Sequence, residues 1–188
     1  MIQPAATKIE IVRAMPCDLA GVRALQEKNH KDNLPQEKRA DGYISLRTEL
    51  PLLERIRRDI GIVACRSDCG IAGFELPLDK SHRLEARGEN DVILPTFYSI
   101  TYRGKAIAEY CWVSGQYCVD APFRGMGIPG MMHPEFLDML KGRFELLVFI
   151  VASTNTRSLH VAKDKFGMVE ATGNVLRTWK TLVQEIKD

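Results

Sequence analysis

The feature that most constrains this chain is a glycine-rich loop, Phe123-Arg124-Gly125-Met126-Gly127-Ile128-Pro129-Gly130. It lies between a strand-like run ending at Val119 and a helix-like run ending near Leu140. Three glycines directly before a helix expose backbone N–H groups toward one point, where the helix dipole also favours negative charge. Arg124 adds a fixed positive charge. The loop predicts a phosphate-binding cradle, although such a turn can also be only a tight connection.

The dinucleotide-binding fingerprint fits this loop poorly. Gly125, Gly127 and Gly130 have its glycine spacing, but the fingerprint requires a strand directly before the first glycine and an acidic residue roughly 20 positions later. Residues 120–124 intervene after the strand, and the next apolar run, Leu146 to Ala152, ends in Ser-Thr. The dinucleotide interpretation is therefore disfavoured.

A second family of cradles fits better. Val119 to Gly127 has a valine five residues before the arginine of an Arg-x-x-Gly pattern, and it resembles the pyrophosphate loop of the GNAT (Gcn5-related) N-acetyltransferases. Asn155-Thr156-Arg157-Ser158, followed by a lysine-rich stretch and Phe166-Gly167, resembles the Asn-x-x-Ser segment of that family. The resemblance is strongest between Gly115 and Met168. It suggests a subgroup with an insertion before its fourth strand.

The resemblance implies a set of coenzyme contacts. Backbone groups of the strand before the loop would bind the acetyl and pantetheine groups, loop amides would bind the pyrophosphate, and an asparagine and a serine would contact the pantetheine arm. The residues so implied are Tyr117, Cys118, Val119, Arg124, Gly125, Met126, Gly127, Ile128, Gly130, Asn155 and Ser158. Acetyl-CoA is then the acyl donor, and no metal is expected. Gly115 predicts a strand bulge that frees a backbone donor for the thioester carbonyl.

The chain departs from the family pattern at several positions. Pro129 replaces a glycine or alanine and removes one N–H donor, and Pro134 either kinks the following helix or delays its start. The segment from Asn155 to Gly167 is one residue longer than the common form and contains no tyrosine to protonate the leaving thiolate. Lys163 or Ala162 takes that place, depending on the direction of counting.

No catalytic residue follows from the sequence. Glu109, His133, His160 and Cys118 are candidates, but each has an ordinary structural explanation, such as a solvated carboxylate or a small core thiol. Two functions stay open. The leading one is direct acetyl transfer from acetyl-CoA to the amine of an unknown acceptor, either a small molecule or a peptide. The alternative is a catalytically degenerate acyl-CoA-binding or regulatory module.

The composition is consistent with this interpretation but does not by itself indicate a function. The formal net charge is +2, and basic and acidic residues are interspersed, which disfavours a nucleic-acid partner. Five cysteines without metal-ligand spacing predict free thiols. Residues 1–8 lack the apolar core of a signal peptide, and no apolar run is long enough for a membrane span, so we expect a cytoplasmic protein without a membrane partner. A homodimer stays open, because dimers are frequent in similar folds.

The order of elements predicts an α/β fold with a mixed, mostly antiparallel central sheet flanked by helices. A strand at 9–13 precedes a helix with Leu19, Val22 and Leu25 on one face, and a polar loop at 29–45 precedes a second helix at 46–60. A hairpin at 62–74 then precedes a strand at 106–119, the helix after the cradle, a strand at 145–152, and a further helix and strand.

The whole chain, 1–188, is expected to form one domain with an insertion around 79–105. The insertion could shape the acceptor site or simply cover a sheet edge.

Overall fold

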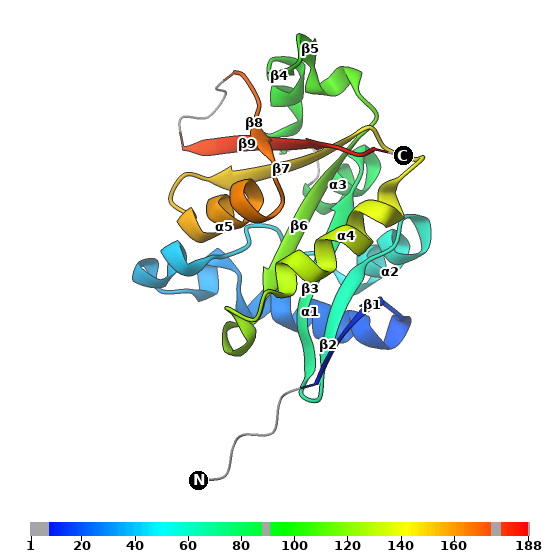
Figure 1. Ribbon diagram of the computed structural model, residues 1–188, viewed down its shortest axis with the longest axis vertical. Helices are drawn as coiled ribbons and strands as arrows, with labels where there is room; N and C mark the ends of the chain where they lie inside the picture. Colours follow the sequence, from blue (N-terminus) through cyan, green and yellow to red (C-terminus); the bar gives the residue numbers. More distant parts are fainter. Residues whose placement is uncertain (1–7, 88–90, 174–177, 188) are drawn as a thin grey trace.

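A computed structural model describes residues 8–87, 91–173 and 178–187, and a twisted seven-stranded sheet forms its centre (Figure 1). The strands are β1 (Ile9–Arg13), β2 (Val63–Ser67), β3 (Gly70–Leu78), β6 (Trp112–Val119), β7 (Leu146–Ala152), β8 (Val169–Glu170) and β9 (Trp179–Glu185). Their order in the sheet is β1-β2-β3-β6-β7-β9-β8. Only the β6–β7 pair is parallel. The predicted fold class, a mixed and mostly antiparallel sheet flanked by helices, is confirmed.

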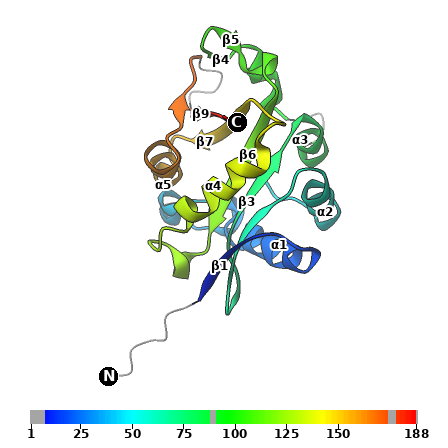
Figure 2. The ribbon, with the colours of Figure 1, turned by 45° about the vertical axis from the view of Figure 1, so that its right-hand side comes forward.

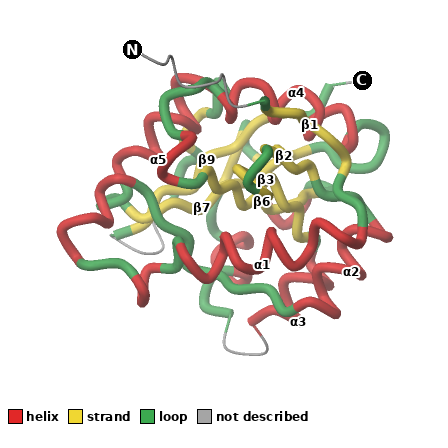
Figure 3. The backbone as a smooth tube through the Cα atoms, turned by 90° about the horizontal axis from the view of Figure 1, so that it is seen from below, coloured by secondary structure: helices red, strands yellow, loops and turns green. Residues whose placement is uncertain are grey.

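Helices cover both faces of the sheet. They are α1 (Leu19–Lys28), α2 (Leu50–Asp59), α3 (Lys80–Arg87), α4 (Ile128–Leu140) and α5 (Thr156–His160). Figures 2 and 3 show α1, α2 and α3 on one face and α4 and α5 on the other. The nearly continuous burial of side chains along β7 follows from this arrangement, because both of its faces are covered.

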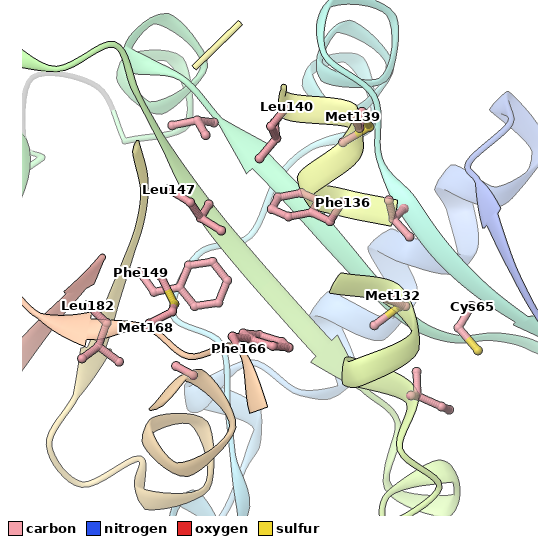
Figure 4. Packing of buried hydrophobic residues seen from close by; sticks show 14 of the residues in the cluster. Cys65, Met132, Phe136, Met139, Leu140, Leu147, Phe149, Phe166, Met168 and Leu182 are labelled. Atoms are coloured by element: carbon pink, nitrogen blue, oxygen red, sulfur yellow. The ribbon is translucent and has the colours of Figure 1, made fainter. Parts of the chain in front are cut away.

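The two main cores lie on opposite faces of the sheet. On one face, Met132 and Phe136 of α4 pack with Phe149 of β7 and with Phe166 (Figure 4). On the other face, Val22 of α1 belongs to a cluster that also includes α2 side chains and inward-facing residues of β2 and β3. Strand β6 therefore lies at the centre of the molecule, supported on both sides.

Several predicted boundaries shift by a few residues. Strand β1 lies at the predicted positions, whereas α2 begins at Leu50 rather than at residue 46, with a proline in its first turn. The predicted loop at 29–45 contains two short 3-10 helices, η2 (Lys31–Asn33) and η3 (Gln36–Asp41). The predicted strand at 106–119 begins only at Trp112, because a 3-10 turn, η6 (Ile107–Glu109), precedes it.

The segment predicted as an insertion covers part of the sheet face and also reaches the central cleft. Its described parts form α3, a 3-10 helix, η5 (Leu94–Tyr98), and a two-stranded ribbon, β4 (Thr101–Tyr102) and β5 (Lys105–Ala106). Phe97 and Ile107 pack on Val148 of β7, and the Trp112 and Phe97 rings meet edge to face at 4.7 Å. Residues 88–90 of this segment lie outside the described residues.

Candidate active site

The sheet opens between its two parallel strands. Pairing of β6 with β7 is confined to Trp112–Ser114 against Leu146–Val148, although β6 continues to Val119 and β7 to Ala152. Beyond Ser114 the two strands separate, as Figure 1 shows. The backbone N–H and C=O groups on the facing edges of β6 and β7 are therefore available to a partner other than the neighbouring strand, since unpaired strand edges present free hydrogen-bonding groups.

The prediction of a strand bulge at Gly115 is wrong. The register of β3 with β6 runs without a shift from Gly73 opposite Val119 to Leu78 opposite Ser114. Glycine occupies position 115 for a packing reason, because a Cβ there would lie 2.0 Å from Cε1 of Phe149. The glycine thus lets a large ring lie against the strand where the sheet opens.

A cavity of about 600 Å³ lies at this opening. It lies between the outer half of β6, the glycine-rich loop, residues 41–44 and the first turns after Asn155. The following predicted site residues line it: Tyr117, Cys118, Val119, Arg124, Gly125, Gly127, Gly130 and Ser158. The structure therefore brings most of the predicted set together around one space.

The glycine-rich loop has the backbone geometry of an open cradle. Gly125 and Gly127 have φ values of 86° and 76°, in the left-handed region that favours glycine, and α4 begins at Ile128. A Cβ added at Gly125, Gly127 or Gly130 would meet nothing within 4 Å. The loop backbone thus faces free space at a helix N-terminus, where an anion is favoured.

Two predicted loop residues contribute differently. Met126 is exposed and Ile128 is fully buried in the core under α4, and neither side chain lines the cavity. The alternatives for Pro134 are also decided, since α4 runs from Ile128 to Leu140 with this proline inside it.

Arg124 is held by the protein itself. Its Nε donates to the Val119 carbonyl at 3.2 Å, and one terminal nitrogen donates to Asn29 Oδ1 at 3.1 Å. The guanidinium therefore supports the loop in addition to giving the cavity positive charge. Arg157 and Lys165 line the same cavity, and Asp41 is the carboxylate among the described lining residues. The charge balance of these walls suits an anionic ligand.

The Asn-x-x-Ser segment caps α5 and binds a loop that is far away in the sequence. Asn155 is 3% exposed, and its Oδ1 accepts the Ser158 N–H at 3.3 Å. Its Nδ2 donates to the Tyr43 carbonyl at 3.0 Å. Beyond α5, Val161–Lys165 forms a π-helical turn in which Phe166 N–H bonds the Val161 carbonyl. This turn absorbs the extra residue noted in the sequence.

A second, smaller cavity of about 90 Å³ lies on the other side of the opening. Asn155, Gly115 and Gln116 line it, together with Arg83 and Ile93 from the inserted segment. Sequence analysis did not single out Arg83, whose guanidinium forms a buried ion pair with Asp91 at 2.7 Å. The pair cancels most of the charge on this wall.

The two cavities share four lining residues: Tyr43, Ile44, Tyr117 and Ser158. Tyr117 stacks on Phe149, and its hydroxyl donates to the Ser158 carbonyl at 3.2 Å. Burial raises the pKa of the Tyr117 phenol well above its ordinary value. The phenol is therefore a neutral hydrogen-bond donor at physiological pH.

The earlier catalytic candidates all make contacts within the protein. Cys118 packs in the core on the α1–α2 face, and burial raises the pKa of its thiol to about 12. Glu109 accepts the Ala106 N–H and lies on η6, away from both cavities. His160 lines the larger cavity and pairs with Asp164. Lys163 pairs with Glu170.

His133 belongs to a buried network that the sequence did not indicate. Its Nδ1 lies 3.0 Å from Glu75 Oε1, its Nε2 lies 2.8 Å from Gln184 Oε1, and its ring stacks on Phe166 at 3.8 Å. Glu75 is fully buried, and burial raises the pKa of its carboxyl. The three polar residues lie on β3, α4 and β9, which no local pattern connects.

All five cysteines carry free thiols, as predicted. Within ranges 8–87, 91–173 and 178–187, no three His, Cys, Asp or Glu side chains gather as they would around a metal ion, and no helix has the length and apolar character to span a membrane.

Comparison with known proteins identifies the fold. No family model matches the chain, and no curated protein matches it in sequence. Solved structures do match: an N-acetyltransferase of Staphylococcus aureus Mu50 is 15% identical with a TM-score of 0.60, over 96% of this chain and 99% of that one. The chain has the GNAT fold. The resemblance seen in the sequence is confirmed at this level.

Two other structures with the GNAT fold were solved with a coenzyme. A phosphinothricin acetyltransferase of Sinorhizobium meliloti, in complex with acetyl-CoA, is 11% identical with a TM-score of 0.58, over 95% of this chain and 88% of that one. The GNAT-family N-acetyltransferase YhbS of Escherichia coli, in complex with CoA, is 15% identical with a TM-score of 0.55, over 100% of this chain and 86% of that one.

Proposed function

We propose that this protein is an acetyl-CoA-dependent N-acetyltransferase of the GNAT type that transfers the acetyl group directly to an amine. One observation carries the proposal: the glycine cradle at the start of α4 opens into a cavity that meets a second cavity where β6 and β7 separate. A donor with phosphates at one end and a reactive group at the other can enter from the first cavity, while an acceptor occupies the second.

The residues present fit acetyl-CoA as the donor. The amides between Gly125 and Gly130, apart from Pro129, would bind the pyrophosphate, and Arg124, Arg157 and Lys165 would balance its charge. The free edge of β6 from Tyr117 to Val119 would bind the pantetheine arm. A backbone N–H from this edge would also stabilise the oxyanion as the thioester carbonyl is attacked.

The transfer itself depends on positioning. The acceptor amine must reach the carbonyl carbon as a free base, within about 3 to 3.5 Å. Among the described residues of the smaller cavity there is no carboxylate or imidazole to accept its proton. A water molecule would therefore carry the proton to solvent. That lack of a base also favours the second candidate function, a binding module that retains the cradle without catalysis.

Calorimetric titration with acetyl-CoA, with NAD as the control ligand, tests the donor site. We expect micromolar affinity for acetyl-CoA and no heat from NAD; binding of NAD alone would reject the assignment of the cradle. A panel of amines, with release of free CoA thiol as the signal, then separates the two functions. Turnover supports the enzyme, whereas tight binding without turnover of any amine supports the module.

A further inference from the structure

The residues shared by the two cavities mark where the reaction must occur. If the donor occupies the larger cavity and the amine the smaller one, as proposed above, the thioester carbon and the amine nitrogen meet at their junction. Tyr43, Ile44, Tyr117 and Ser158 form this junction. Any side chain that handles a proton of the reacting atoms is therefore expected among these four.

Only two of these side chains have acidity suited to a thiolate. Ile44 is apolar, and an aliphatic hydroxyl such as that of Ser158 is a much weaker acid than a phenol, whose pKa is about 10. The Tyr117 hydroxyl already donates to the Ser158 carbonyl, and its ring is fixed between Phe149 and Phe166. Tyr43 is the remaining phenol.

Tyr43 belongs to a segment that is fastened on both sides. Its carbonyl accepts the buried Asn155 amide at 3.0 Å. The neighbouring Ile44 exchanges two backbone hydrogen bonds, accepting from Lys31 at 3.0 Å and donating to the Asn29 carbonyl at 3.0 Å. The backbone at Tyr43 is thus held against both the end of α1 and the start of α5.

The Tyr43 hydroxyl is available for a ligand. The side chain is half-buried, and its hydroxyl makes no hydrogen bond to another residue in the part of the chain that the structure describes. A half-buried tyrosine that lines both cavities, with a fixed backbone and a hydroxyl without an internal partner, is suited to donate to a group that arrives with the substrate.

We infer that Tyr43 is the acid that protonates the leaving thiolate of the coenzyme. This inference rests on the proposed function. The amine nitrogen forms a bond to the acetyl carbon, the C–S bond breaks, and sulfur keeps the electron pair. Sulfur takes the phenolic proton of Tyr43. The resulting phenolate recovers a proton from water, while the amine nitrogen loses its surplus proton to water, so that the products are an amide and free CoA thiol. Asn155 acts as a positioning residue through the Tyr43 carbonyl.

The first test needs no acceptor. The pKa of the bound CoA thiol is measured from its thiolate ultraviolet absorbance in wild type, Tyr43→Phe and Tyr117→Phe. A donor to sulfur stabilises the thiolate, so Tyr43→Phe should raise that pKa by about one unit. Tyr98→Phe is the matched control, because Tyr98 is 69% exposed and lines neither cavity. An equal thiol pKa in wild type and Tyr43→Phe overturns the inference, as does a shift seen only in Tyr117→Phe.

The second test follows turnover with any accepted amine. Tyr43→Phe should lower kcat by about 100-fold and leave the KM for acetyl-CoA unchanged. Asn155→Ala should lower kcat less than Tyr43→Phe, and the double variant should be no worse than Tyr43→Phe, since both act through one hydroxyl. Additive losses overturn the positioning role of Asn155. If wild type fails to bind CoA at all, the proposed function fails instead, which calorimetry distinguishes directly.

Discussion

Gly115 of β6 lies directly beneath Phe149 of β7, so closely that a Cβ on the glycine would stand 2.0 Å from the ring. The same ring stacks on Tyr117, which lines both cavities. The absence of a Cβ at position 115 thus lets the Phe149 ring and the Tyr117 phenol stack on each other where β6 and β7 separate.

Gly115→Ala should lower the free energy of unfolding by about 1–3 kcal/mol, because Phe149 must move in a packed core. It should also weaken acetyl-CoA binding as Tyr117 follows the ring. Urea unfolding and calorimetry measure the two effects. Gly130→Ala adds the same methyl group on α4 where nothing lies within 4 Å, and should leave the unfolding free energy unchanged or slightly higher. Equal stability of Gly115→Ala and wild type would contradict the packing argument.

Gly127→Val should weaken acetyl-CoA binding at least tenfold, since a branched side chain fills the space in front of the cradle and φ of 76° disfavours it. Gly104→Val is the matched control for backbone strain. Gly104 has φ of 81° and open space around it, but it lies in the β4–β5 turn. Calorimetry on both folded variants separates strain from binding. Equal losses of affinity would show that the cradle assignment is wrong.

Arg124→Ala and Arg157→Ala should differ in their effect on stability. Both should weaken coenzyme binding, and the loss should shrink as salt rises. Only Arg124→Ala should also destabilise the fold, by about 1 kcal/mol, because its guanidinium holds Val119 and Asn29. Titrations at two salt concentrations and urea unfolding provide the comparison. If the loss of affinity in Arg124→Ala does not depend on salt, the role of Arg124 is structural alone.

Burial of Glu75 gives the protein a specific pH dependence. The folded-state pKa of this carboxyl is raised above its unfolded value of about 4.3, so the folded state retains a proton that the unfolded state has released. The free energy of unfolding should fall as pH rises from about 4.3 through the raised pKa. Glu75→Gln should remove this decline.

Urea unfolding across that pH range checks the Glu75 prediction. Glu135→Gln serves as the control, since Glu135 is exposed on α4, the helix that carries His133. Parallel pH profiles for wild type and Glu75→Gln would contradict a raised pKa at this carboxyl.

Acceptors with a second positive charge should be poor substrates. The smaller cavity has no carboxylate among its described lining residues, and Arg83 is its fixed charge, neutralised by Asp91. A second ammonium would therefore be buried without a partner, which is costly. A monoamine should show kcat/KM at least tenfold above that of the diamine of equal chain length. Preference for the diamine would place the acceptor outside this cavity.

Local signals in the sequence predicted much of the fold and much of the lining of the larger cavity. The glycine spacing at 125–130 and the apolar run before Val119 can be recognised from residues that are neighbours in the sequence. The structure has a strand that ends at Val119 and a helix that begins after the glycine-rich loop, as these patterns predict. The roles of Tyr117, Asn155 and the other expected coenzyme contacts stay predictions, although most of these residues surround one cavity.

The lining of the smaller cavity could not be predicted in the same way. Tyr43 is held at the site in part by Asn155, which is more than a hundred residues away in the sequence and donates to its carbonyl. Arg83 reaches it because the chain after β3 folds back over the sheet. Gly115 suggested a bulge because a glycine in a strand usually has a backbone cause, whereas its cause here is a ring from the neighbouring strand.

Asn29, at the end of α1, gives the glycine-rich loop and the Tyr43 segment a common support. Its side-chain oxygen accepts from Arg124 beside the cradle, and its backbone carbonyl accepts from Ile44 next to Tyr43. Through these two hydrogen bonds, one buried residue holds both the arginine beside the cradle and the loop that carries Tyr43, so two walls of the larger cavity share a single anchor.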